Sequence, residues 1–102
     1  MLHHKRYTAL PDREILDEIG RRLGSLRKSC GLTQADAAER ADLGRNTLSR
    51  AERGDNPTLL TVIRLLRTYG ELSALESLVP EPEVSPMDRL RARKAGKAEP
   101  RA

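Results

Sequence analysis

The sequence LTQADAAERADLGRNTLSRAERG, residues 32–54, contains two short helical patterns separated by a turn. The first begins after Thr33, whose hydroxyl can accept a hydrogen bond from a free backbone N–H near Asp36. A stripe of small apolar side chains follows, which would let a second helix approach closely: Ala35, Ala38 and Ala41. The segment therefore predicts two helices packed against each other.

The second pattern follows Gly44 and separates apolar from polar side chains. Leu48 and Ala51 lie three residues apart and share the predicted inward face. The opposite face carries only hydrogen-bonding side chains: Arg45, Asn46, Ser49, Arg50 and Arg53. Such a face suits the DNA major groove, where each base pair presents its own pattern of donors and acceptors.

Apolar spacing predicts three more helices and hence an all-α domain over residues 12–79. The first helix has a stripe of apolar side chains: Ile15, Ile19, Leu23 and Leu26. The fourth, capped by Thr58 or by Asn56, is apolar over most of its circumference, which predicts burial on more than one side. A short fifth helix presents one apolar face: Leu72, Leu75, Leu78 and Val79.

Three glycines bear on how the first helix ends and packs. Gly20 and Gly24 each cost about 1 kcal/mol of helix propensity relative to alanine. Their spacing of four fits either a close helix contact or chance. Gly31 suits the left-handed conformation that closes a helix.

Length and composition indicate one small domain built from aliphatic side chains, with two tyrosines as the only aromatic residues among 102. No apolar run reaches membrane length and no signal peptide is evident, so we expect a soluble cytoplasmic protein. Cys30 is the only cysteine, and His3 and His4 lie at the N-terminus. These residues make no metal-ligand or nucleophile pattern, so we expect no metal, no cofactor and no catalysis.

The net charge of +4 is unevenly distributed along the chain. Residues 12–79 contain eleven basic and eleven acidic side chains, whereas residues 87–102 contain six and two. A neutral domain that binds nucleic acid must therefore concentrate positive charge on one face. We expect residues 1–11 to form a flexible arm. Residues 80–102 should form a proline-rich connector and a basic tail without stable structure.

Several motifs occur in a fixed order: Leu26-Arg27, Gly31-Leu32-Thr33-Gln34, Ala38, Leu48-Ser49-Arg50, Glu52-Arg53-Gly54 and Pro57-Thr58. In this order they resemble the Cro/phage-repressor type of helix-turn-helix protein, often called the XRE family, over roughly residues 14–78. The resemblance implies a five-helix, lambda-repressor-like DNA-binding domain.

The resemblance also implies site residues, position by position. Contacts to base edges would come from Arg45, Asn46, Ser49 and Arg50. Contacts to DNA phosphates would come from Gln34, Thr47, Arg53 and Asn56. Arg27 and Glu52 would form an internal salt bridge that sets the angle of the reading helix. Two positions depart from the family pattern: Gly44 replaces a capping Ser or Thr, and Ala51 replaces a larger aliphatic residue.

We expect the protein to act as a homodimer on near-palindromic DNA, because a single domain of this size offers only a few base contacts. Pairing through Leu72, Leu75 and Leu78 would place two reading helices about 34–36 Å apart. The segment LVPEPE at residues 78–83, with Ser85-Pro86-Met87 and the basic tail, resembles the C-terminal part of antitoxins that bind Hip-type kinase toxins. The resulting interpretation is a repressor of its own operon that also binds a toxin. A stand-alone phage or stress repressor and a protein-binding adaptor remain alternatives.

Overall fold

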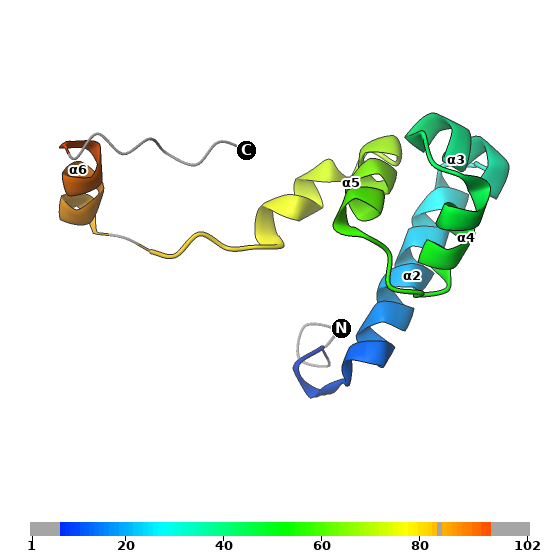
Figure 1. Cartoon of the computed structure of the whole chain (residues 1–102), viewed down its shortest axis with the longest axis horizontal. Coiled ribbons are helices and arrows are strands. Elements are labelled where there is room, and N and C mark those ends of the chain that lie inside the picture. The colour runs from blue at the N-terminus through cyan, green and yellow to red at the C-terminus, as the bar shows by residue number, and fades with distance from the viewer. Residues whose placement is uncertain (1–6, 84, 95–102) are drawn as a thin grey trace.

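The computed structural model describes residues 7–83 and 85–94, and within these ranges it contains helices and no strands (Figure 1). The helices are α2 (Asp12–Ser29), α3 (Gln34–Ala41), α4 (Arg45–Glu52), α5 (Leu59–Thr68), the 3₁₀ helix η1 (Leu72–Ser77) and α6 (Pro86–Lys94). Residues 7–9 are also helical. The predicted all-α fold is confirmed, and the fifth element of the domain is a 3₁₀ helix.

Helix α2 begins and ends where the sequence indicates. Asp12 and Glu14 place acidic groups in its first turn, and Arg27 and Lys28 place basic groups in its last turn. Both arrangements are favourable to the helix dipole. Gly31 has φ +71°, so the predicted left-handed residue after the helix is confirmed.

Helix α3 is capped by a side chain at its N-terminus and by backbone contacts at its C-terminus. The Thr33 hydroxyl accepts a hydrogen bond from the Asp36 backbone N–H at 3.1 Å, as predicted. At the other end Asp42 is left-handed (φ 56°), and the Leu43 N–H donates to the Ala38 carbonyl at 2.9 Å. The Arg64 guanidinium of α5 then donates to the Asp42 carbonyl at 3.1 Å. Both ends of α3 are therefore capped. The contacts at its C-terminal end fix the turn that leads into α4.

The core lies where α2, α3, α4 and α5 meet, and Leu48 and Leu65 are completely buried in it. The predicted stripe of buried alanines on α3 was wrong at one position. Ala35 is exposed, and Ala37 is fully buried instead. Helix α3 packs against both α4 and α5, so its buried face is centred on Ala37 and Ala41, one turn apart.

Helix α5 is less enclosed than its composition predicted. The Thr58 hydroxyl caps it by accepting from the Thr61 N–H at 3.1 Å, which decides between the two proposed caps. Its first turn is open, with Leu59 and Leu60 exposed to 56% and 54%. The prediction of burial on several sides was therefore wrong for this turn. Coverage by α3, α4 and η1 buries Thr61 and Leu65 and leaves the start of the helix free.

The chain beyond η1 contains a helix that the sequence analysis did not predict. Figure 1 shows α6 apart from the other helices, at the end of an extended connector. The Ser85 hydroxyl accepts from the Asp88 N–H at 3.2 Å, and Arg91 pairs with Asp88 at 3.4 Å. These local interactions favour two turns of helix where an unstructured tail was expected. Residues 1–6 of the expected arm and 95–102 of the expected tail lie outside the described residues.

Candidate nucleic-acid interface

The outward face of α4 presents the polar side chains that the sequence placed there. Arg45, Asn46, Thr47, Arg50 and Arg53 are exposed, and Ser49 is half-buried. Leu48 and Ala51, on the opposite face, are buried in the core. The helix therefore has one anchored face and one face that is free to meet a ligand.

A shallow depression of about 480 Å³ joins this face to the start of α3. It is lined by Gln34, Arg45, Asn46 and Ser49. All four side chains can donate hydrogen bonds, and the amides and the hydroxyl can also accept them. The depression thus brings together one residue predicted to bind phosphate and three predicted to bind bases.

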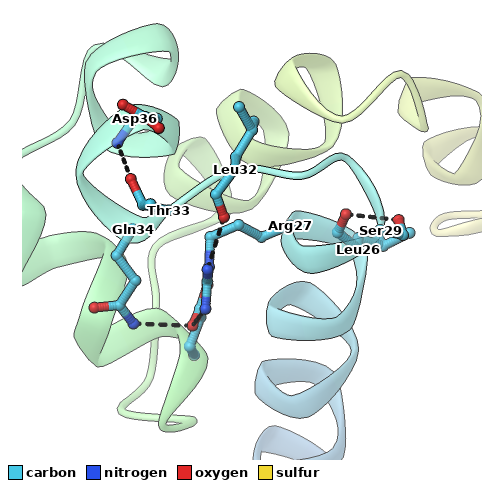
Figure 2. Close-up of polar contacts among 8 residues, drawn as sticks. Leu26, Arg27, Ser29, Leu32, Thr33, Gln34 and Asp36 are labelled. Carbon is cyan, nitrogen blue, oxygen red and sulfur yellow. Dashed lines mark hydrogen bonds and ion pairs between the residues drawn. The ribbon is translucent and has the colours of Figure 1, made fainter.

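A buried ion pair supports the face from behind. The Arg27 Nε atom lies 2.7 Å from Glu52 Oε2, its Nη2 lies 3.2 Å from Oε1, and both side chains are only 11% exposed. Figure 2 shows the guanidinium of Arg27 also reaching the Leu32 carbonyl, to which Nη1 donates at 2.9 Å. Hydrogen bonding to Glu52 raises the pKa of Arg27, so this group stays positively charged.

Glu52 has a second partner that links the ion pair to the depression. The Gln34 amide nitrogen donates to Glu52 Oε1 at 3.0 Å (Figure 2). One amide hydrogen of Gln34 is therefore committed inside the domain, while the other hydrogen and the oxygen remain for a ligand. Arg27 from α2, Glu52 from α4 and Gln34 from α3 form one continuous network.

Backbone contact between α2 and α4 sets their separation. A methyl group at Gly20 would lie 2.6 Å from the Glu52 carbonyl oxygen and 2.8 Å from that of Ala51. At Gly24 the nearest atom would be Glu52 Oε1, at 3.4 Å. Gly20 thus marks a close backbone contact between the helices, whereas Gly24 has only ordinary contact with a side chain. This approach also explains how the small Ala51 can be fully packed.

Arg13 holds the C-terminal end of α4, a role that the sequence analysis missed. Its guanidinium donates to the carbonyls of Gly54 at 3.2 Å and Arg53 at 3.4 Å. A cation beside the last carbonyls of a helix satisfies groups that have no partner within the helix. The spacing of Arg13 and Asp17, which pair at 3.0 Å, was the only sequence signal for this position.

Asp55 was also missed, and it lies among three arginines at the edge of the α4 face. Its carboxylate is 3.7 Å from Arg53 Nη2, 3.9 Å from Arg50 Nε and 4.0 Å from Arg13 Nη1. Arg53 additionally donates to the Ser49 hydroxyl at 2.9 Å. The positive charge of this edge is therefore partly balanced within the domain.

The remaining predicted site residues are Asn56, in the loop that follows Asp55, and the leucines of the predicted dimer face in and after η1. Asn56 is exposed in the loop before α5, with a left-handed backbone (φ 45°). Of the predicted dimer face, Leu72 and Leu75 are half-buried, and Leu78 is 53% exposed.

A family model described as helix-turn-helix matches residues 23–76, more than half of the chain. The protein belongs to the helix-turn-helix family. Its matched region includes α3, the turn at Asp42 and α4, and this domain is that of a DNA-binding transcription regulator. No curated protein and no solved structure matches the chain.

The described part of this helix-turn-helix protein contains neither a candidate metal site nor a candidate membrane span. Within 7–83 and 85–94, no three His, Cys, Asp or Glu side chains are placed to hold a metal ion. None of the described helices combines the length and the apolar character needed to span a membrane.

Proposed function

We propose that the protein is a sequence-specific repressor that inserts α4 into the major groove of its operator. The observation that carries this proposal is the division of α4 into a rigidly supported inner face and an exposed outer face of hydrogen-bonding side chains. Precise support matters because base recognition depends on placing donors and acceptors against fixed positions on the base edges.

In this proposal the base contacts come from Arg45, Asn46, Ser49 and Arg50. Arginine can bridge O6 and N7 of guanine, and asparagine can bridge N6 and N7 of adenine. The Ser49 hydroxyl already accepts from Arg53, so its own hydrogen remains available to a base acceptor.

Phosphate contacts come from residues around the edge of the same face: Gln34, Thr47, Arg53 and Asn56. Gln34 is held by Glu52 with part of its amide still free, so it is oriented before DNA arrives. The first N–H groups of α3 lie beside it and favour an anion. These contacts would fix the register of the domain on the duplex and carry little sequence information.

The repressor would act as a homodimer, since one α4 offers only a few base contacts. Leu72, Leu75 and Leu78 are the proposed dimer face, and the exposure of Leu78 supports this choice. Two copies would read half-sites about 34–36 Å apart on near-palindromic DNA.

A second proposed role is that of an antitoxin that binds a Hip-type kinase toxin. Helix α6 favours a protein partner because Met87 and Leu90, three residues apart, are exposed to 64% and 46%. The same protein would then repress its own operon and bind the toxin through its C-terminal segment.

A footprint on the DNA upstream of the protein's own gene tests the proposal. The full chain should protect two half-sites, and protection should weaken as salt is raised. A chain ending at Val79 should retain the footprint if the tail serves only a protein partner. Absence of any protected sequence would contradict the repressor function. The antitoxin role would be supported if a kinase co-purifies with the full chain and not with the chain ending at Val79.

A further inference from the structure

The position of Asp55 points to a role in limiting the affinity of the domain for DNA. It is a half-exposed carboxylate within 4.0 Å of three guanidinium groups, those of Arg13, Arg50 and Arg53. Arg50 and Arg53 belong to the proposed DNA-binding face of α4. The Arg13 guanidinium instead donates to carbonyls at the C-terminal end of α4.

These ion pairs are too long and too exposed to serve mainly as stability elements. The distances are 3.7–4.0 Å, and the arginine side chains are 59–61% exposed. Exposed pairs of this kind contribute little to folding because water screens them and the side chains lose freedom. Arg50 and Arg53 can therefore leave Asp55 at little cost when a phosphate or a base is offered.

Helix capping does not explain an acidic residue at this position. The residue caps α4 through its backbone, because the Asp55 N–H donates to the Arg50 carbonyl at 3.0 Å. Any residue except proline could make this bond. A negative side chain just beyond a helix C-terminus is unfavourable to the helix dipole.

We propose that Asp55 is a residue of the DNA-binding face that lowers the affinity of the domain for DNA of every sequence. Its carboxylate takes the position of a phosphate between Arg50 and Arg53 in the free protein, and it repels phosphates in a complex. Repulsion of phosphates opposes backbone contacts, which are common to all sequences, and the pairing with Asp55 must be broken before Arg50 or Arg53 can contact DNA of any sequence. The penalty is common to all sequences, so it weakens binding to random DNA and to the operator by a similar factor. This inference rests on the proposed DNA-binding function.

Charge balance supports this role. Residues 12–79 carry equal numbers of acidic and basic side chains, so the domain has little bulk attraction for DNA. Three arginines nevertheless gather at the end of α4, each within 4.0 Å of Asp55. A single carboxylate there has more influence on nonspecific binding than one placed elsewhere on the surface.

The test compares Asp55→Asn with the wild-type full chain on two duplexes, measured by fluorescence anisotropy over a series of salt concentrations. One duplex has a scrambled sequence, and the other is the DNA upstream of the protein's own gene. Asp55→Asn should bind the scrambled duplex more tightly, by roughly two- to fivefold, since one exposed charge interaction is exchanged. The logarithmic salt dependence should steepen by about one phosphate contact. Affinity for the upstream duplex should rise by a similar factor, so the ratio of the two affinities should stay nearly constant.

Glu71→Gln is the matched control, because it removes one negative charge from an exposed position at the start of η1, and η1 packs against α5. It should leave scrambled-duplex affinity unchanged. Equal tightening by both variants would show a bulk charge effect and overturn the role of Asp55. If the wild type binds DNA and Asp55→Asn binds the scrambled duplex equally or more weakly, the proposed role of Asp55 is overturned. The proposed repressor function would be unaffected by that result. Failure of every variant to bind either duplex would overturn both proposals.

Discussion

Arg27 and Glu52, 25 residues apart in the chain, are joined by two hydrogen bonds of 2.7 and 3.2 Å that connect α2 to the end of α4. Each side chain is only 11% exposed, so both charges are largely removed from water. The pair fixes α4 without using any side chain of its outward face. Its main effect is on the orientation of the helix, because a buried ion pair adds little net stability compared with apolar residues.

Removal of one partner of this pair should be costly. Glu52→Gln leaves the Arg27 guanidinium buried without a counter-charge, so we expect a loss of about 3–5 kcal/mol in the free energy of unfolding, measured by urea denaturation. The double variant Arg27→Met, Glu52→Leu removes both charges and should recover much of that loss. A single variant as stable as the wild type would show that the pair is effectively solvated.

Gly20 and Gly24 allow a test of backbone contact within one helix. Gly20→Ala places a methyl group 2.6 Å from a carbonyl oxygen that belongs to the backbone, so the helices must separate. We expect a loss of about 3 kcal/mol, at the upper end for overpacking. Gly24→Ala meets a side chain at 3.4 Å and gains helix propensity, so it should stay within about 1 kcal/mol of the wild type. Thermal melts of both variants decide the point, and equal melting temperatures would contradict the close contact.

Tyr69 should make stability sensitive to alkaline pH. It is 6% exposed, and its hydroxyl has no hydrogen-bond partner among the described residues. Burial raises its pKa to about 12, whereas an unfolded tyrosine titrates near 10. The folded state thus keeps a proton that the unfolded state releases. This contribution to stability is complete below pH 10 and is lost as pH rises toward 12.

Tyr69→Phe removes that hydroxyl and serves as the comparison. At pH 7 we expect the free energy of unfolding to rise by about 1 kcal/mol, because an unpaired buried polar group is eliminated. Between pH 10 and 12 the variant should lose less stability than the wild type. Denaturation curves at pH 7 and across the alkaline range measure both effects. A less stable variant at pH 7 would indicate that the hydroxyl is hydrogen-bonded in solution.

Arg50→Ala should reduce sequence-specific binding while leaving the fold intact, since the side chain is exposed. Loss of one bidentate base contact corresponds to about 1–3 kcal/mol, or roughly 5- to 150-fold in affinity for the upstream DNA. Affinity for a scrambled duplex should change much less. Arg53→Ala, at a proposed phosphate contact, should weaken binding to both duplexes by the same factor. If Arg50→Ala shows this uniform loss as well, Arg50 contacts only phosphate.

Much of the domain could be predicted because its signals are local. Helical spacing in residues 12–29, the Thr33 cap and the left-handed Gly31 depend on near neighbours in the chain. The family motifs also brought Arg27 and Glu52 together across 25 residues. These features would be recognised in any chain with the same pattern.

Other features depend on how distant segments meet, and sequence spacing does not determine that. The choice between Ala35 and Ala37 depends on the direction from which α5 covers α3. The exposure of Leu59 and Leu60 depends on where that coverage stops. Arg13 and Asp55 acquire their partners only because α2 crosses the end of α4.

The contact at Gly20 has a consequence for how the binding preference of this domain can diversify. Carbonyl groups, and not side chains, form the α4 surface that meets this glycine, and carbonyls are the same whatever residue carries them. The outward residues of α4 can therefore be exchanged without altering the docking of the helix. Substitutions at Arg45, Asn46 and Arg50 could be combined in a library and selected against new operators, with the scaffold unchanged.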